Sequence, residues 1–400
     1  MAKVEYREYR PEDAESFLRL HDSVFPRMSP EYWADWSRGQ VTAAVALRDG
    51  EVVGAVPFQF RDFLIRPGVS VPVAWEYSVC TREDVRGTGV GSRLMEVAAE
   101  FLRGRCLAMM VYREDERSRA YRFYRRTGHE DLAYLTSWVR EPAPVWPSAG
   151  VRRVAYAEFL EQQERAVDLF RSAYGNQAGY PPRFCGYYEV AVQTPQYEEV
   201  PLDLSVLQVP AEGSMRGYAI VGEEKLVPAL HLLEIATEGS DLSVALPLLA
   251  AYADLATERG VPAHARLGGG SPYAPVLQAL GFHPRARSRG GMMILGRVLD
   301  PEGLAEAAWR PSEATRGLEV TVWTPEREVI LHGASGGEGR RLMLEMKESS
   351  LARLLLGRLD LTAALEMGLV TAPGACGADL AAVVDALPWA RWAYHQLDFV

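Results

Sequence analysis

Cysteine is scarce in the 400-residue chain, and only three of its 43 basic residues are lysine. The four cysteines, Cys80, Cys106, Cys185 and Cys376, lie far apart and form neither a CxxC pair nor a zinc-ligand spacing. A disulfide framework or a structural zinc site needs closer and more regular cysteines. We therefore expect reduced thiols, a cytoplasmic protein and no bound metal.

Long apolar runs are also missing. No run reaches the ~18 residues of a membrane-spanning helix. The first ten residues, MAKVEYREYR, are charged and lack the apolar stretch of a secretory signal. Neither a membrane span nor export is expected.

No segment of the chain is basic. The net charge is −10, with residues 1–140 neutral, residues 141–298 at −4 and residues 299–400 at −6. Proteins that bind nucleic acid or anionic membranes carry a basic face, so neither is an expected partner. An acidic protein attracts cationic substrates instead.

The length of the chain, a linker-like segment and a helix-start signal predict three domains. At roughly 150 residues per domain, the chain has room for two or three. The segment 141–150, EPAPVWPSAG, reads as a linker, and Asp300-Pro301 reads as the N-cap and first residue of a helix. We place the domains at residues 1–147, 148–298 and 299–400.

Hydrophobic periodicity predicts an α+β (mixed α/β) fold. Helices are expected at 12–21, 92–103, 118–126, 242–257, 274–280, 301–309, 351–359, 362–367 and 378–387. Strands are expected at 41–47, 52–60, 71–80, 106–112, 133–139, 216–221, 231–236, 263–267, 292–298, 318–323, 328–332 and 341–346. The likeness of YRRTGHE around Gly128 to LQALGFH around Gly281 suggests an internal duplication.

The stretch Val85–Gly91, VRGTGVG, lies between an expected strand and an expected helix. Such a junction offers free main-chain amides at a positive helix end, which binds phosphate or pyrophosphate. A Walker A loop would need Lys-Ser/Thr after Gly91, where Ser92-Arg93 stands, and a dinucleotide-binding fingerprint would need glycine at Ser92. A glycine-rich turn without a ligand is the remaining alternative.

Arg86, Gly89 and Gly91 form the pattern Arg-x-x-Gly-x-Gly, which resembles the acetyl-coenzyme A loop of the GNAT acetyltransferases. The downstream SRAYRFYRRTGHE resembles the next motif of that family. The resemblance implies a central mixed β-sheet flanked by helices and acetyl-CoA as co-substrate, its pantetheine arm lying between two splayed strands. The residues that it implies for acetyl-CoA binding are Ser78, Val79, Cys80, Arg86, Gly87, Thr88, Gly89, Val90, Gly91, Arg119 and Ala120.

The same resemblance implies direct transfer of the acetyl group, with Tyr124 as the general acid that protonates the departing thiolate. A phenol with a reference pKa of ~10 can serve only if it is positioned and desolvated. The alternative for Tyr124 is a packing residue at a core edge, which is the role expected for Tyr121.

The three-part layout resembles the enhanced-intracellular-survival (Eis) type acetyltransferases, whose C-terminal domain is sterol-carrier-like. This resemblance implies tandem GNAT folds and a homo-oligomer, a trimer or hexamer. It also makes the Val400 carboxylate the general base and Asp398 a substrate contact. The second domain lacks the loop pattern and has Leu277 at the position of Tyr124, so one active site per chain is expected.

The C-terminal segment carries Trp392, Tyr394, Leu397, Phe399 and Val400, which a frayed tail would expose. We predict a docked terminal strand.

Substrate contacts are expected from Asp22, Trp33 and Trp36, with Glu31 and Asp35 nearby. A solvated acidic helix with core tryptophans is the alternative. Glu76 could also contact the substrate, as a rival base acting through water. His21 and His129 have no motif support and are expected at the surface or at an edge.

The sequence thus predicts an acetyl-CoA-dependent N-acetyltransferase acting on a primary amine of a cationic substrate, such as an aminoglycoside-like molecule, a polyamine or a lysine side chain. The alternative is a non-catalytic protein whose C-terminal domain holds an apolar ligand.

Overall fold

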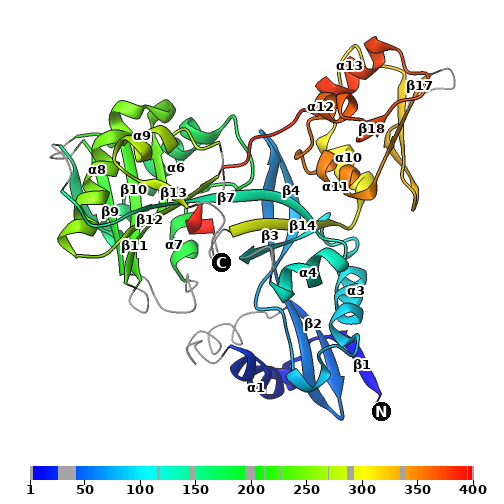
Figure 1. Cartoon of the computed structure of the whole chain (residues 1–400), viewed down its shortest axis with the longest axis horizontal. Coiled ribbons are helices and arrows are strands. Elements are labelled where there is room, and N and C mark those ends of the chain that lie inside the picture. Colours follow the sequence, from blue (N-terminus) through cyan, green and yellow to red (C-terminus); the bar gives the residue numbers. More distant parts are fainter. Residues whose placement is uncertain are drawn as a thin grey trace.

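The computed structural model describes residues 3–25, 42–114, 118–144, 150–193, 203–210, 213–224, 228–268, 270–285, 292–333, 339–393 and 395–398. Three regions follow one another along the chain (Figure 1). Helices and strands are mixed in each, which confirms the mixed α/β fold class.

The first region contains most of the expected elements. Its strands are β1 (Val4–Glu8), β2 (Thr42–Arg48), β3 (Glu51–Arg66), β4 (Val69–Glu76), β5 (Cys80–Thr81), β6 (Ala108–Glu114) and β7 (Glu130–Arg140). Its α-helices are α1 (Ala14–Val24), α3 (Val90–Leu102) and α4 (Arg119–Arg126). The β2–β3 turn has positive φ at Asp49 and Gly50, as a tight two-residue hairpin requires.

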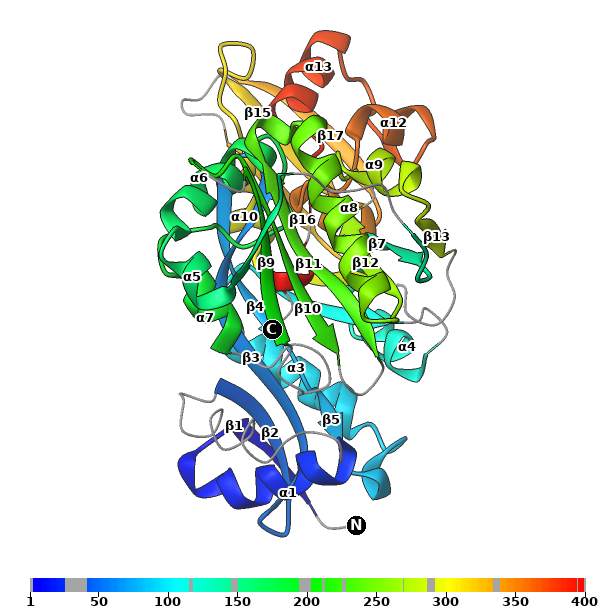
Figure 2. The same ribbon diagram turned by 90° about the vertical axis from the view of Figure 1, so that its left-hand side faces the viewer.

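The second region has additional elements. Its strands are β8 (Arg152–Ala155), β9 (Asp203–Val209), β10 (Gly217–Glu224), β11 (Ala229–Thr237), β12 (Ala263–Gly268), β13 (His283–Arg285) and β14 (Met292–Val298). Its helices are α5 (Tyr156–Leu160), α6 (Gln163–Tyr174), α7 (Tyr187–Gln193), α8 (Leu242–Glu258) and α9 (Ala274–Ala279). The periodicity did not reveal β8, β9, β13 or the helices before β9. Figure 2 shows α8 lying along the neighbouring strands β10 and β11, against which it packs.

The third region forms a separate small sheet with strand order β16-β15-β17-β18. Its strands are β15 (Leu318–Trp323), β16 (Glu328–His332), β17 (Arg340–Met346) and β18 (Val370–Thr371). Its helices are α10 (Pro301–Ala308), α11 (Glu348–Leu355), α12 (Leu361–Glu366) and α13 (Gly377–Ala386). Asp300 caps α10 by accepting a hydrogen bond from the Gly303 amide at 2.9 Å, which confirms the predicted cap.

The first two regions share one sheet, ordered β1-β2-β3-β4-β6-β14-β7-β12-β11-β10-β9-β8. Strand β14 comes late in the second region but lies between β6 and β7, and β7 and β14 run side by side in Figure 1. The first half of β7 pairs with β14 and its second half with β12 and β13. The two regions therefore cannot separate without breaking this shared sheet, and the domain boundaries at 147 and 298 stay predictions.

The C-terminal tail returns from the third region to the junction of the other two. Trp392 forms an isolated bridge with Ala178, and the Ala393 amide donates to the Ala178 carbonyl at 2.7 Å. Trp392 and Leu397 are buried, so docking of the tail is confirmed. The predicted terminal strand is wrong for the described residues of the tail, because Gln396–Asp398 form a 3-10 turn.

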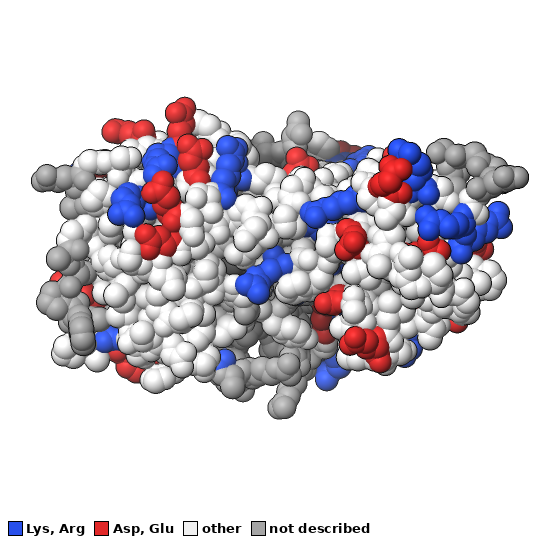
Figure 3. Space-filling view, turned by 90° about the horizontal axis from the view of Figure 1, so that it is seen from above, with Lys and Arg blue, Asp and Glu red and all other residues white. Residues whose placement is uncertain are grey.

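No helix within the described ranges is both long and apolar enough to cross a bilayer. On the face seen in Figure 3, acidic and basic side chains lie among one another.

Gly179 allows the tail to pass close to the second region. Its φ is +84°, and a Cβ built there would lie 2.4 Å from the Trp392 Cβ. We expect Gly179→Ala to lower the free energy of unfolding by roughly 2–5 kcal/mol, through left-handed strain and overpacking. The control is Gly68→Ala, whose φ is +75° but whose Cβ would meet nothing within 4 Å. Denaturant unfolding should give the control only the ~1–2 kcal/mol of strain. Equal losses in the two variants would contradict the close approach.

Candidate active site

The parallel strands β4 and β6 part at one end of the first region. They pair up to Glu76 and Val111, after which β6 continues to Glu114 while β4 stops. The chain then passes through Tyr77–Val79 and joins β3 through the pairing of Cys80 with Ala55. Ser78 has φ +46°, a strained value for a residue other than glycine. The predicted continuous strand 71–80 is therefore wrong, because the chain changes neighbour at this point and leaves β4 and β6 apart.

The glycine loop lies beside this opening, at the N-terminus of α3. Residues 86–89 are exposed, Gly87 has φ +78° and Gly89, the N-cap of α3, has φ +90°. The amides of residues 89–92 have no intrahelical acceptor, and the helix dipole makes this end positive. The Nε of Arg86 donates to the Thr81 carbonyl at 3.1 Å, which anchors this side chain at the start of the loop. This arrangement fits an anion such as a pyrophosphate.

Helix α4 faces the same loop. An added Cβ on Gly91 would lie 3.4 Å from Phe123 of α4, so the helices approach closely here. Ser118 caps α4 by accepting from the Tyr121 amide at 3.0 Å. Arg119, the first helical residue, is exposed, and Ala120 is partly buried.

Tyr124 lies on the inner face of α4 and is 3% exposed. Burial raises the pKa of its hydroxyl well above the usual value, and the nearby Glu76 carboxylate raises the pKa further, against the lowering effect of Arg113. The phenol therefore keeps its proton at physiological pH. Its ring makes an edge contact with the His129 ring, with centroids 5.1 Å apart. Tyr121 instead donates from its hydroxyl to Asp131 at 2.9 Å.

A buried acid–histidine pair lies next to Tyr124. The Nε2 atom of His129 is 2.7 Å from Oε1 of Glu76, and both side chains are inaccessible to solvent. The other oxygen, Oε2 of Glu76, is buried and has no hydrogen-bond partner among the described residues. The expectation that His129 lies at the surface is wrong. Gly128, with φ +85°, ends α4 and lets the His129 amide donate back to the Tyr124 carbonyl at 3.1 Å, which brings the ring beneath the helix.

A second histidine underlies the break after β4. Nε2 of His21, on α1, is 3.3 Å from the Ser78 carbonyl oxygen and 3.6 Å from Sγ of Cys80. His21 is fully buried, which lowers its pKa to about 4, and burial raises the pKa of the Cys80 thiol. The surface expectation for His21 is wrong as well, because α1 packs against β5 and encloses the ring. The α1 pattern could have placed His21 on the buried face, since it stands four residues after Phe17.

Of the substrate residues predicted between positions 22 and 36, the structure describes only Asp22. Asp22 is exposed on α1, next to His21 in the chain. Trp33 and Trp36, with Glu31 and Asp35, lie outside the described residues, and so does Val400.

Asp398 is fully buried on the docked tail. Its Oδ1 is 2.6 Å from Nη2 of Arg183 and accepts a hydrogen bond from Tyr187 at 2.6 Å. Burial raises the pKa of Asp398 to about 6, although Arg183 opposes this shift. A direct substrate contact is not favoured by this placement, because Oδ1 is already engaged. Sequence reasoning did not single out Arg183, since nothing local in the chain marks it as the partner of residue 398.

Arg61 links this tail to the strand that carries Glu76. Its Nη1 donates to the Asp398 carbonyl at 3.2 Å, and its guanidinium lies 5.1 Å from the ring centroid of Trp75. Trp75 immediately precedes Glu76 on β4. The tail thus docks next to the end of β4.

The second region has a comparable helix-to-glycine turn, but it lacks the tyrosine and the open helix N-terminus. Gly281 follows α9 with φ +82°, as Gly128 follows α4, but Leu277 is fully buried where the match with the first region places Tyr124. The N-terminus of α8 is already capped by Asp241, which accepts from the Ser243 amide at 2.8 Å. A carboxylate at this position disfavours an anion, so only α3 offers an open anion site of the two.

Comparison with known proteins agrees with this geometry. Residues 6–129 match the acetyltransferase (GNAT) family. The matched segment contains the loop, the parted strands and Tyr124. Over those residues the first region is similar to the N-acetyltransferase domains of the GNAT family.

Solved structures resemble the chain over nearly its full length. A GCN5-related N-acetyltransferase from Kribbella flavida is 17% identical, with 98% of this chain and 97% of that chain covered and a TM-score of 0.68. A probable N-acyltransferase from Enterococcus faecalis V583 is 13% identical, with 99% of both chains covered and a TM-score of 0.72. Eis1 from Mycobacterium abscessus is 15% identical, with 98% and 99% covered and a TM-score of 0.61. At these identities the likeness establishes the fold. No curated protein sequence matches.

Among the residues that the structure describes, no group of three or more His, Cys, Asp and Glu side chains could hold a metal ion.

Buried His21 makes the stability of this domain depend on pH. Its pKa is about 4 when folded, against ~6.5 when unfolded. Its contribution is therefore complete above pH 6.5 and is lost as the pH falls toward 4. We expect His21→Gln to reduce the fall in unfolding free energy between pH 7.5 and 4.5 by about 2 kcal/mol, from ~1.4 kcal/mol per pH unit. Buried His395, whose pKa is also lowered, keeps part of the dependence in both proteins.

Urea unfolding at several pH values measures this difference. The matched control is His283→Gln, because His283 is exposed and should leave the wild-type dependence intact. A His21→Gln curve parallel to the wild-type curve would refute the assignment.

Proposed function

We propose that the chain is an acetyl-CoA-dependent N-acetyltransferase that transfers the acetyl group directly to a primary amine of a cationic substrate. The observation that carries the proposal is the open, positive N-terminus of α3 beside parted strands, with a buried, protonated tyrosine on the adjacent helix α4. The acceptor belongs to the class of aminoglycoside-like molecules, polyamines and lysine side chains. The net charge of −10 favours such a cation.

Acetyl-CoA, when bound, supplies the activated thioester. The amides of the loop residues Gly87–Gly91 bind its pyrophosphate, and Arg86 and Arg119 add charge-assisted hydrogen bonds at either side. Main-chain groups of Ser78–Cys80, which leave the sheet where β4 ends, lie beside the pantetheine arm. Ala120 and Val90 line the space between the two helices.

Tyr124 acts as the general acid. Its raised pKa keeps the phenol protonated until a stronger base appears next to it. The thiolate leaving group becomes more basic when it is desolvated in the same enclosed space, and it accepts the phenol proton as the carbon–sulfur bond breaks. Glu76, close by and negative, discourages the phenol from losing its proton earlier.

The carboxylate of Val400 acts as the general base for the attacking amine. The support is the docking of the tail at Asp398, two residues earlier, next to the end of β4. Glu76 is the rival base, and its unpartnered Oε2 atom supports a role through an intervening water. Asp22, Trp33 and Trp36 contact the cationic acceptor.

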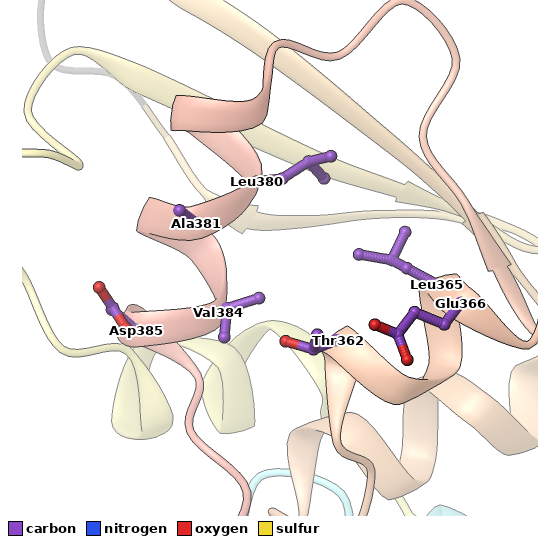
Figure 4. Close-up of a pocket in the computed structure, with 7 residues that line it drawn as sticks. All are labelled: Thr362, Leu365, Glu366, Leu380, Ala381, Val384 and Asp385. Atoms are coloured by element: carbon purple, nitrogen blue, oxygen red, sulfur yellow. The ribbon is translucent and has the colours of Figure 1, made fainter.

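The second region serves as a scaffold, and the third is a sterol-carrier-like domain. The protein is a cytoplasmic homo-oligomer, a trimer or hexamer. A hollow of about 340 Å³ between α12 and α13 supports the alternative of a bound apolar ligand, with Leu365, Leu380 and Val384 pointing into it (Figure 4). The carboxylates of Glu366 and Asp385 also line the hollow, which weakens this alternative.

The acid role is tested with Tyr124→Phe. Loss of the proton donor should lower kcat by ~10²–10⁴-fold. Coenzyme A should still raise the melting temperature of the variant as it does for the wild type, because the loop is untouched. The control is Tyr121→Phe, whose hydroxyl bonds Asp131 and which should keep most of the wild-type kcat. A fully active Tyr124→Phe enzyme would remove the acid assignment, and absence of any thermal shift with coenzyme A would remove the proposed function itself.

Two variants distinguish the two candidate bases. A chain that ends at Asp398 lacks the Val400 carboxylate, and Glu76→Gln lacks the rival carboxylate. We expect the shortened chain to lose ~10²-fold or more in kcat, as for removal of a general base, and Glu76→Gln to lose less than ~10-fold. Val400→Ala is the matched control, since it changes the last side chain and keeps the terminal carboxylate. Initial rates at saturating acetyl-CoA measure all three. The opposite ranking of the two losses would assign the base to Glu76.

A further inference from the structure

Strand β6 carries an arginine into the opening where β4 has ended. Arg113 stands two residues beyond Val111, the last residue of β6 that pairs with β4. On its other side β6 keeps its neighbour, because Arg113 pairs with Met293 of β14. The arginine therefore stands on a paired strand of the sheet, at the edge that β4 has left.

Arg113 lies on the same face of the sheet as Tyr124. Side chains alternate along a strand, so Arg113 shares a face with Val111, two residues before it. Val111, Met293 and Tyr124 belong to one cluster of buried side chains. Glu76 pairs with Val111 and so shares this face as well. Burial and Glu76 raise the pKa of the Tyr124 hydroxyl, and the nearby cation Arg113 lowers it.

The Nε–H group of Arg113 is a buried donor without an acceptor. It has no hydrogen-bond partner among the residues that the structure describes, and the same holds for Oε2 of Glu76. These two atoms therefore do not bond to each other, although they carry opposite charges on one face of the sheet. Leaving a buried polar group unbonded is costly, and more so for a charged group. A pair of such groups beside parted strands is typical of a site whose partners arrive with the substrates.

Acyl transfer separates charge in the direction that these two groups favour. The nitrogen of the amine bonds to the carbonyl carbon and gains positive charge, while the carbon–sulfur bond breaks and leaves its electron pair on sulfur. Tyr124 protonates the sulfur, and the proton that the nitrogen loses returns to the phenol by way of solvent. A carboxylate on the β4 side favours the positive nitrogen, and a guanidinium on the β6 side favours the negative sulfur.

We infer that Arg113 is a further catalytic residue: its Nε–H group binds the sulfur as the carbon–sulfur bond breaks and stabilises the negative charge that forms there. The inference rests on the proposed function, in which Tyr124 protonates this sulfur. The sulfur of an intact thioester carries no full charge, so Arg113 contributes to bond breaking and little to the binding of acetyl-CoA. In this respect it differs from Arg86 and Arg119, whose partner is the pyrophosphate.

The test measures the pKa of the thiol of coenzyme A bound to the full-length protein, read from the ultraviolet absorbance of the thiolate in a pH titration. A neighbouring cation lowers the pKa of an acid by ~1–3 units. In the wild type we expect the bound thiol to titrate below the ~8.5 of a free thiol. In Arg113→Gln its pKa should be at least ~1 unit higher than in the wild type. Arg113→Lys keeps the charge and should lie between the two.

The matched control is Arg103→Gln, which removes an exposed arginine at the far end of α3 and should titrate as the wild type does. Steady-state rates give a second readout. Arg113→Gln should lower kcat ~10-fold or more, the rate equivalent of one pKa unit, while the KM for acetyl-CoA stays within about twofold.

Equal thiol pKa values in Arg113→Gln and the wild type would overturn the inference, even if kcat falls, because a loss of kcat alone can come from a structural role. If Arg113→Gln does not fold, the wild-type titration decides: a bound thiol that titrates at or above the value of free coenzyme A contradicts a cation beside the sulfur. Either result leaves the transferase standing. Absence of a thermal shift of the wild type with coenzyme A would instead remove the proposed function and the inference together.

Discussion

The arrangement of the site depends on one loss of hydrogen bonding, where β4 stops pairing with β6 after Glu76 and Val111. Two parallel strands that part expose main-chain groups on facing edges, and an extended ligand can take the place of the missing strand contact. At the break Ser78 adopts a left-handed backbone conformation, and the chain then pairs with β3 through Cys80. The loop before α3, the inner face of α4 and the buried ring of His21 are all arranged around this opening.

The shared sheet explains why a second region without an open anion site remains part of the protein. Strand β14 completes the sheet of the first region, and β7 is divided between the two. The second region differs at two local points: Asp241 caps the N-terminus of α8, and Leu277 is apolar and buried. The shared sheet itself cannot be lost, because the active half is built from its strands.

Buried ionisable groups mark the places where the structure departs from a simple apolar core. Oε1 of Glu76 lies 2.7 Å from Nε2 of His129 next to Tyr124, and Arg183 joins two carboxylates around the tail. Each such group is retained in a solvent-free position at a cost in desolvation. The pair lies at the end of β4, and Arg61 links the cluster at the tail to the same strand through its contact with the Trp75 ring.

The sequence by itself determined the features that depend on neighbours in the chain. Gly89 and Gly91 in a strand-to-helix junction and Asp300 as the cap of α10 follow from local backbone and capping chemistry, so the loop and these helices could be predicted, and the resemblance to a known family singled out Tyr124 on α4. The partners of Glu76, the burial of His21, the insertion of β14 and the link from Arg183 to Asp398 could not. These join residues 53 to more than 200 positions apart, and no periodicity or spacing encodes which distant side chains meet. Only the packing of the shared sheet and the docked tail decided them, because burial requires each charge to find its partner in space and not in sequence.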